Sequence, residues 1–411
     1  MSDIFKTINF CRICESDEIS EVMNLGGQPP ANSLYELIKP PSVPLRLVFC
    51  EKCSTVQLGE DVDPEYLFSE YLWITGTSET AINYSRDFAE KALKHFNSNY
   101  EELFVIEVAS NDGTFLQQFQ KIGCKVLGVD PAINIAKIAE KIGIPTHADF
   151  FSKELAETLL AQNGSADLIY ARNVIPHVKE IHSVISGIEA LLSNDGIGII
   201  EFHNAGLLVQ EMHYDYIYHE HLFYYTLTTI EALLKRHGLF IFDVSRSPIS
   251  GGSWVVYFSK NNRDKTSDLV KVQNSEIEIE YNKKESWINL SINAKKHSEK
   301  LTDIVLQQVR DNGKIVAYGA SARSSTLLNY CGINSNHISV VIDKNPLKHG
   351  LMTAGSDIPI VSYQDGLNFI KGSSIILLLA WNFKDEIIQE LRQSGYKGKF
   401  IVPLPGQPRI V

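Results

Sequence analysis

The chain has 411 residues, a length that predicts two to three domains of ordinary size. Hydrophobic residues make up 44% of it and charged residues 21%, which is typical of globular proteins and excludes a disordered or coiled-coil chain. The formal net charge of −11 disfavours a nucleic-acid partner, because proteins that bind nucleic acid present a basic face. No apolar run is long enough to span a bilayer and no secretory signal is visible, so we expect a cytoplasmic protein that binds no membrane.

Two C-x-x-C pairs stand near the N-terminus, Cys11 with Cys14 and Cys50 with Cys53. In a reducing cytosol such pairs are typical of a metal site rather than of disulfides. Four thiolates complete the tetrahedral coordination of Zn²⁺ and leave no position open for a substrate, so we predict a structural zinc site. The alternative is that the four are unrelated buried thiols. The Pro-rich stretches within residues 28–41 predict an irregular loop between the pairs.

An alternation of apolar strands and amphipathic helices begins after the first hundred residues. The pattern predicts strands over residues 103–109, 125–130, 167–172 and 196–202, with a helix over 114–122 after the first of them. Strands that alternate with helices form a parallel sheet covered on both faces, so the predicted fold class is α/β. Ligands of such sheets bind beyond the carboxyl ends of the strands.

Two residues at the predicted carboxyl ends indicate a nucleoside ligand. Gly113 follows the first strand, where a glycine allows backbone and ligand to approach closely, and Asp130 ends the second, where a carboxylate can bind both ribose hydroxyls. The turn lacks the G-x-G-x-x-G pattern that cradles a pyrophosphate. A ribose-binding acid without that cradle favours S-adenosylmethionine as the cofactor. The alternative is an acid that only caps the next helix.

The last third of the chain predicts a second α/β unit. Residues 264–308 are polar and lack Gly and Pro, which indicates a long helix that joins two domains. Further strands are predicted over residues 314–318, 338–343 and 374–380. Small residues follow the first of these strands and Arg323 stands among them, as expected of a phosphate-binding turn. A second dinucleotide-binding fold, or a tight turn that merely needs small residues, is the alternative.

Four motifs follow the paired cysteines in chain order: Glu107–Thr114, Ile217–Tyr225, Ser250–Ser253 and Ala317–Arg323. Together with the cysteines they resemble the sugar C-methyltransferases, which act on nucleotide-linked 4-keto-6-deoxyhexoses, typically at C3. The likeness spans nearly the full length. It implies three units: a zinc-binding module over residues 1–70, a class I S-adenosylmethionine-dependent methyltransferase domain over 71–262, and a helical linker with a Rossmann-like C-terminal domain over 263–411.

The resemblance, together with the rule on strand ends, assigns ligand contacts to both α/β units. Cofactor contacts fall on the first loop and on neighbouring strand ends: Glu107, Ser110, Asn111, Asp112, Gly113, Asp130, Pro131, Asp149, Phe150 and Asn173. Contacts with a nucleotide-sugar substrate fall on the C-terminal domain: Tyr318, Gly319, Ala320, Ser321, Arg323, Asp343, Trp381 and Asn382. Ala109 departs from the family, which usually has Gly at that position.

Methylation of carbon needs a base that removes a proton and a group that stabilises charge on the neighbouring carbonyl oxygen. The resemblance implies catalytic or substrate-contacting roles for Tyr71, His177, Tyr218, Glu220 and His221. We expect His221 to be the general base, because the unperturbed pKa of His lies closest to neutral. Tyr71 and Tyr218 would hold the enolate oxygen or exchange protons. Glu220 and His177 would orient the base or bind a sugar hydroxyl.

Other interpretations compete with this one. The His-Glu-His stretch lacks the i, i+4 spacing of zinc peptidases, and a packed aromatic edge is its structural alternative. A nucleic-acid methyltransferase with a zinc module is disfavoured by the net charge. A small-molecule O- or N-methyltransferase and a non-catalytic scaffold are further alternatives. We expect a monomer or a weak homo-oligomer.

Overall fold

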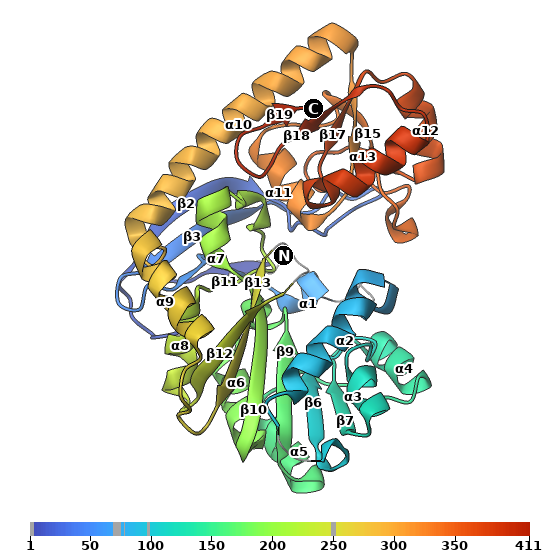
Figure 1. Ribbon diagram of the computed structural model, residues 1–411. Coiled ribbons are helices and arrows are strands. Elements are labelled where there is room, and N and C mark those ends of the chain that lie inside the picture. The colour runs from blue at the N-terminus through green and yellow to red at the C-terminus, as the bar shows by residue number, and fades with distance from the viewer. Residues whose placement is uncertain (1–3, 69–74, 78, 97–98, 248–251) are drawn as a thin grey trace.

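The computed structural model describes residues 4–68, 75–77, 79–96, 99–247 and 252–411. Figure 1 shows a small sheet built by the N-terminal strands, an α/β domain below it and a second α/β domain above it. Helix α10 (Lys284–Asn312) runs along one side of the molecule to the upper domain. No helix in the described ranges is long and apolar enough to cross a lipid bilayer.

The N-terminal unit is an antiparallel sheet of order β11-β4-β3-β2. Its own strands are β2 (Ile19–Gln28), β3 (Val43–Cys50) and β4 (Val56–Leu58), and β11 (Phe223–Tyr224) joins it from the middle of the chain. A separate ribbon pairs β1 (Phe5–Thr7) with β5 (Glu60–Val62). The fully described stretch 29–42 holds no helix and no strand longer than one bridge, so the predicted irregular loop is confirmed.

The lower domain contains a seven-stranded sheet of order β12-β13-β10-β9-β6-β7-β8. All neighbours from β10 to β8 are parallel, and β13 runs antiparallel to both of its neighbours. The strands are β6 (Phe104–Val108), β7 (Lys125–Val129), β8 (Thr146–His147), β9 (Ala166–Arg172), β10 (Leu192–His203), β12 (Phe240–Arg246) and β13 (Ser253–Ser259). The helices of this part are α1 (Pro64–Phe68), α2 (Glu79–Leu93), α3 (Leu116–Ile122), α4 (Ile133–Lys141), α5 (Lys153–Asn163), α6 (Ile181–Leu191), α7 (Ala205–Glu211) and α8 (Leu227–Arg236). The predicted parallel α/β domain is confirmed.

The upper domain contains a six-stranded sheet of order β16-β15-β14-β17-β18-β19, parallel except for its last pair. Its strands are β14 (Ile315–Tyr318), β15 (Ile338–Ile342), β16 (Ile360–Val361), β17 (Ile375–Leu378), β18 (Lys399–Val402) and β19 (Arg409–Ile410). Its helices are α11 (Ala322–Tyr330), α12 (Tyr363–Lys371) and α13 (Lys384–Gln393), and α9 (Ser267–Ile279) precedes α10. A parallel sheet that changes direction of strand order at β14 is the second Rossmann-like unit that the sequence predicts.

The predicted single helix over residues 264–308 is two helices. Glu280 ends α9 in the left-handed region, with φ of 62°, and so breaks the helical hydrogen bonding. Tyr281 is buried, and its carbonyl accepts a 2.9 Å hydrogen bond from Trp287 Nε1. A Cβ at Gly206 of α7 would lie 2.5 Å from the Tyr281 ring. The break between the two helices therefore coincides with tight packing of the Tyr281 ring on the lower domain. The polar sequence pattern of this stretch does not predict that contact.

The N-terminal unit contacts both α/β domains. Tyr35 forms backbone hydrogen bonds with Met352 of the upper domain, 3.2 and 2.7 Å long, and its hydroxyl bonds Asp357. His219 of the lower domain donates from Nε2 to the carbonyl of Pro44 at 3.2 Å. The loop between β2 and β3 and the start of β3 therefore bring the N-terminal unit into contact with both larger domains.

Candidate active site and zinc site

The four paired cysteines converge on one point. Their Sγ atoms all lie within 4.8 Å of one another, with 3.5 Å between those of Cys11 and Cys53 and 3.4 Å between those of Cys14 and Cys50. A tetrahedral Zn²⁺ with Zn–S bonds of about 2.3 Å needs sulfurs about 3.8 Å apart, so the set fits zinc. Four thiolates leave no open coordination position, which makes the site structural.

Both pairs fold through the same turn. Glu15 and Ser54 adopt the left-handed conformation, with φ of 61° and 59°. Their amides donate to the carbonyls of Cys11 and Cys50 at 2.8 and 2.9 Å. Each turn therefore aims two sulfurs at one ion, which is why the short C-x-x-C spacing predicted the site.

The loop after β6 passes through three left-handed residues, Ala109 (φ 54°), Asn111 (φ 51°) and Gly113 (φ 77°). Asp130, directly after β7, holds this loop. Its Oδ2 accepts from the Asn111 amide at 2.8 Å, and its Oδ1 accepts from the Ala132 amide at 2.9 Å. Burial raises the pKa of Asp130, and the two amides oppose that rise. Each carboxylate oxygen keeps a lone pair, which suits ribose hydroxyls.

Gly113 is required by packing within the protein. A Cβ at this position would lie 3.0 Å from Cγ1 of Ile144, and its φ is positive. The expected reason, close approach to a ligand, is therefore not needed to explain this glycine. Asp112 also belongs to the loop's own framework, since it accepts from Thr114 Oγ1 at 2.7 Å and from the Gly76 amide at 2.8 Å.

Other predicted cofactor residues surround the same strand ends. The Ser110 hydroxyl is buried and has no hydrogen-bond partner among the described residues. Phe150 is 66% exposed beyond β8, and Pro131 and Asp149 are exposed nearby. Asn173 follows β9 with φ of 52°. An orphaned hydroxyl and a bare aromatic ring beside a carboxylate fit a nucleoside such as that of S-adenosylmethionine.

Glu107 belongs to a buried network beneath the loop. Its Oε2 accepts a 3.1 Å hydrogen bond from the Tyr170 hydroxyl. Burial raises the pKa of Glu107 well above its ordinary value, and the charge of Arg172 opposes that rise. Arg172 donates to Glu201 Oε2 at 2.8 Å and lies 3.3 Å from the ring centroid of Phe115. The network ties β6, β9 and β10 together under the predicted cofactor.

Three predicted catalytic side chains meet above these strand ends. The ring of His221 lies 3.9 Å from that of Tyr218 and 4.8 Å from that of His177, between centroids. Its Nδ1 lies 2.9 Å from the carbonyl oxygen of Tyr216. A carbonyl only accepts, so Nδ1 carries the proton and Nε2 is left as an acceptor. Burial lowers the pKa of His221 well below its ordinary value and that of His177 to about 4, so both rings are neutral at pH 7.

Glu220 joins this cluster to the N-terminal unit. Its Oε1 accepts a 2.7 Å hydrogen bond from Nδ2 of Asn32, which lies between β2 and β3. Burial raises the pKa of Glu220 to about 7, and the hydrogen bond from Asn32 opposes the rise. His219 bonds the zinc module instead, so only His221 of the two motif histidines takes part in the cluster of rings. Tyr71 lies outside the described residues.

Asp215, which the sequence analysis missed, connects the two α/β domains. Its side chain is 1% exposed and accepts from Arg323 Nε and Nη2, both at 3.0 Å, and from Trp381 Nε1 at 2.8 Å. Arg323 and Trp381 were expected to bind substrate, yet both donate hydrogen bonds to the Asp215 carboxylate. Arg323 keeps Nη1 for a ligand. The available signal was a lone acid between Tyr214 and Tyr216.

The loop after β14 repeats the geometry of the loop after β6. Asp343 accepts from the amide of Ala320 at 2.7 Å and from that of Asn345 at 2.8 Å, as Asp130 accepts from its own two amides. Ser321 caps α11 by accepting from the Ser324 amide. Gly319 has φ of 101°, and a Cβ there would lie 2.5 Å from the Ala380 side chain. The two Rossmann-like units therefore share one way of holding a loop.

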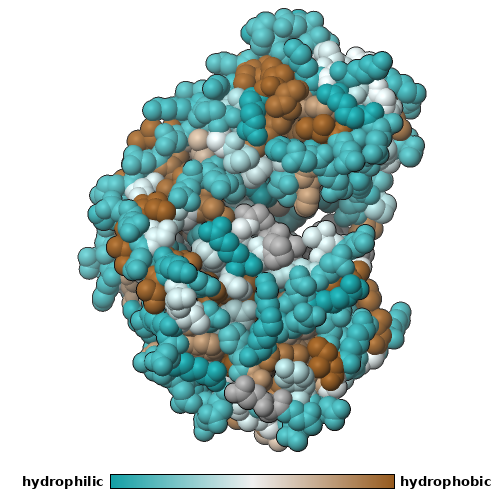
Figure 2. Space-filling model, viewed as in Figure 1, coloured by the Kyte–Doolittle hydropathy of each residue, from teal (hydrophilic) through white to brown (hydrophobic). Residues whose placement is uncertain are grey.

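The remaining predicted substrate residues differ in accessibility. Tyr318 is buried, and its hydroxyl donates to Glu390 at 3.2 Å. These contacts within the domain give Tyr318 a structural role. Asn382 is exposed just beyond the end of β17. Figure 2 shows the surface hollowed between the upper and lower domains.

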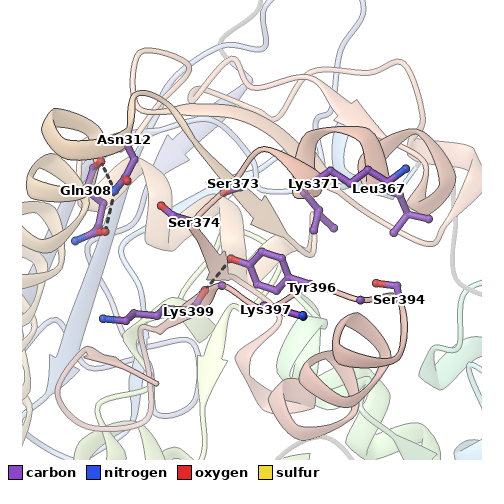
Figure 3. A pocket seen from close by; sticks show the side chains of 13 residues that line it. Gln308, Asn312, Leu367, Lys371, Ser373, Ser374, Ser394, Tyr396, Lys397 and Lys399 are labelled. Atoms are coloured by element: carbon purple, nitrogen blue, oxygen red, sulfur yellow. Dashed lines mark hydrogen bonds between the residues drawn. The ribbon is translucent and has the colours of Figure 1, made fainter.

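A pocket of about 690 Å³ lies at the opposite end of the upper sheet (Figure 3). Its lining includes Ser374 and Lys399, at the amino ends of β17 and β18, and the Tyr396 hydroxyl donates to the Lys399 carbonyl at 3.1 Å. Lys371 and Asn312 line it from the last turns of α12 and α10. Lysines at helix C-termini offset the negative end of the helix dipole. The pocket is remote from the strand ends that hold the predicted ligands.

Comparison with known proteins covers the whole chain. Three family models match in order: a zinc-binding domain at residues 11–68, a methyltransferase domain at 83–243 and a C-methyltransferase C-terminal domain at 248–405. The C-methyltransferase NovU from Streptomyces niveus is 30% identical over 425 residues, which cover 100% of this chain and 99% of that protein.

Similar solved structures extend over less of the chain. A magnesium protoporphyrin IX methyltransferase from Synechocystis PCC 6803 with bound S-adenosylmethionine shows 14% identity and a TM-score of 0.33, covering 44% of this chain and 79% of that one. The PH0226 protein from Pyrococcus horikoshii shows 14% identity and a TM-score of 0.36, covering 47% and 98%. These likenesses are too low to carry an argument. The full-length match and the three ordered domains do carry one: the chain belongs to the C-methyltransferase family, enzymes that depend on S-adenosylmethionine and contain a zinc-binding domain.

Proposed function

We propose that the enzyme transfers a methyl group from S-adenosylmethionine to C3 of a nucleotide-linked 4-keto-6-deoxy sugar. The observation that carries the proposal is the contact of His221 Nδ1 with the Tyr216 carbonyl, which leaves Nε2 as a bare acceptor in the cluster of rings with Tyr218 and His177. The proposal divides the chain into units 1–70, 71–262 and 263–411 and places the enzyme in the cytoplasm as a monomer or weak homo-oligomer.

His221 is the proposed general base. A ketone acidifies the proton on the adjacent carbon, because the conjugate base is an enolate. Nε2 of His221 takes that proton, and the resulting imidazolium keeps its Nδ1–H bond to the Tyr216 carbonyl. A strongly depressed pKa makes His221 a weak base, so the substrate's own negative charge must help to stabilise the imidazolium.

Tyr218 and Tyr71 are the proposed partners of the enolate oxygen. Burial raises the pKa of Tyr218 well above its ordinary value, so the hydroxyl stays protonated and can donate to that oxygen. Glu220 and His177 lie beside the base and would bind a sugar hydroxyl or orient the ring. Bound S-adenosylmethionine supplies the electrophilic methyl group, which the proposed cofactor residues from Glu107 to Asn173 would place in line with the carbon.

The nucleotide is proposed to bind the upper domain. Ser321 follows β14 and the exposed Asn382 follows the neighbouring strand β17, and Asp343 stands where a ribose-binding acid is expected. Arg323 Nη1 is the donor available for the diphosphate. Because Arg323 also holds Asp215, the same residue would connect nucleotide binding to the catalytic motif.

The test is mass spectrometry of an incubation that pools dTDP-, GDP-, UDP- and CDP-linked 4-keto-6-deoxy sugars with S-adenosylmethionine. We expect one sugar nucleotide to gain a methylene unit in step with S-adenosylhomocysteine. In D₂O without a methyl donor, the same sugar should exchange its C3 proton, and His221→Ala should abolish that exchange. Methylation without loss of a carbon-bound proton would instead indicate an O- or N-methyltransferase. No turnover of any sugar by protein that binds the cofactor would contradict the proposal.

A further inference from the structure

His203 is a buried side chain whose hydrogen bonds are all unmade. It ends β10 at the carboxyl side of the sheet and is 5% exposed. Neither Nδ1 nor Nε2 has a hydrogen-bond partner among the described residues. Buried polar groups in native proteins are nearly always paired, since an unpaired one loses its bonds to water without replacement. Two such atoms on one ring call for a partner that the protein does not supply.

The ring of His203 is part of the catalytic cluster. It stacks on Tyr216, with centroids 3.8 Å apart and planes inclined by 21°. Tyr216 in turn lies 4.4 Å from His221, the proposed base, and its carbonyl fixes the tautomer of that base. On the other side, His203 faces His213 at 6.3 Å, a residue that lies against Trp381 of the upper domain. His203 therefore stands between the proposed base and the proposed nucleotide site.

The surroundings keep His203 neutral. Burial lowers its pKa well below the ordinary value, and the charges of Arg323 and His213 lower it further. A neutral imidazole offers one N–H donor and one bare acceptor. Its complement is a ligand that both accepts and donates, such as a sugar with neighbouring hydroxyl and carbonyl oxygens. A purely anionic ligand satisfies only the donor.

We propose that His203 is a substrate-binding residue that hydrogen-bonds a sugar oxygen when the nucleotide sugar enters the site between the two α/β domains. The inference rests on the proposed function, because it takes the ligand to be a sugar. It adds a residue at the end of β10 to those in the family motifs. His203 is assigned to binding of the sugar, and His221 remains the proposed base.

The test compares two substitutions of His203. His203→Phe keeps a ring on Tyr216 but removes both nitrogens, whereas His203→Gln keeps a donor and an acceptor. We expect His203→Phe to lower kcat/KM for the sugar nucleotide at least tenfold and to leave S-adenosylhomocysteine binding unchanged. His203→Gln should retain a larger share of kcat/KM.

Thermal unfolding of the substrate-free enzyme distinguishes this role from a structural one. His203→Phe removes two unpaired buried atoms, so its Tm should equal or exceed that of the wild type. The matched control, His219→Phe, loses the bond to Pro44 and should have a lower Tm. If the wild type is active and His203→Phe is equally active, the proposed contact is overturned. It is also overturned if His203→Phe has a lower Tm and binds the cofactor more weakly than the wild type. A wild type that methylates none of the sugars overturns the proposed function and this contact with it.

Discussion

Among single residues, Glu220 has a carboxyl group whose ionisation should appear in the pH dependence of activity. Its pKa is raised to about 7 by burial, so the carboxyl is protonated below that pH and ionised above it. Asn32 donates to it at 2.7 Å and thereby stabilises the ionised form. Removing this donor should move the titration to higher pH.

We therefore expect Asn32→Ala to shift the inflection of the kcat/KM profile near pH 7 upward. The measurement is kcat/KM between pH 5.5 and 9 for the wild type and the variant. Glu220→Gln serves as the control, because it cannot ionise and should remove the inflection altogether. An inflection that persists unchanged in Glu220→Gln would assign this titration to another group.

Ala109 is an L-residue in the left-handed region, with φ of 54°. Left-handed backbone destabilises an L-residue by about 1 to 2 kcal/mol, a strain that glycine does not have. Glycine in turn lowers the free energy of unfolding by about 0.4 to 1 kcal/mol, because it makes the unfolded chain more flexible. Ala109→Gly should therefore leave the free energy of unfolding unchanged or raise it slightly, as measured by urea titration. Ala161→Gly, in the exposed face of α5, is the control and should lower it by about 1 kcal/mol. Equal losses in both variants would show that Ala109 is not strained.

The sequence predicted residues whose chemistry depends on short spacing. The paired cysteines are an example, because each C-x-x-C turn places two sulfurs by itself. Asp215, His203 and Asn32 could not be found in this way. Their partners lie 108, 13 and 188 positions away in the chain, and only tertiary packing brings them together.

Among helices and strands, local pattern predicted the buried parallel strands well. Each residue of β6 is buried, and an apolar run interrupted only by Glu107 marked the strand to within a residue at each end. Strands β2 and β3 were not predicted, because their pairing has two register shifts and the Pro-rich segment between them is irregular. The break between α9 and α10 was missed because nothing in a polar stretch marks Glu280 as left-handed.

The contact between the short helix η4 (Tyr214–Tyr216) and α11 is where a single charge should matter most. Asp215→Ala would leave Arg323 buried without its carboxylate, and breaking a buried pair costs about 3 to 5 kcal/mol. We expect a loss of that size in the free energy of unfolding, measured by urea titration. Glu157→Ala breaks the exposed pair with Lys153 and should change it by less than about 0.5 kcal/mol. Similar small losses in both variants would show that the buried pair is not a structural link.

At the scale of the whole molecule, the zinc module is a connector rather than an appendage. Its sheet takes β11 from the methyltransferase domain, directly after the His-Glu-His motif. Its long loop reaches both Glu220 and the C-terminal domain. On the far side, His182 of α6 donates from Nε2 to the carbonyl of Ile13, between the first two cysteines, at 3.1 Å. A structural metal site is thereby coupled to the geometry of the active site.

Zinc removal should therefore act on stability first and on activity through it. Cys11→Ser leaves three thiolates, so we expect zinc content to fall below one equivalent by elemental analysis and the free energy of unfolding to fall by several kcal/mol. Turnover per folded molecule should decline too, because Asn32 and β11 lose their support, yet the cofactor should still bind the methyltransferase domain. Cys124→Ser, outside the cluster, is the matched control and should retain zinc and activity. Unchanged stability after complete loss of zinc would contradict a structural role. Full loss of turnover in a protein of unchanged stability would also contradict a structural role. It would mean that the metal takes part in the chemistry, which a site closed by four thiolates is not expected to do.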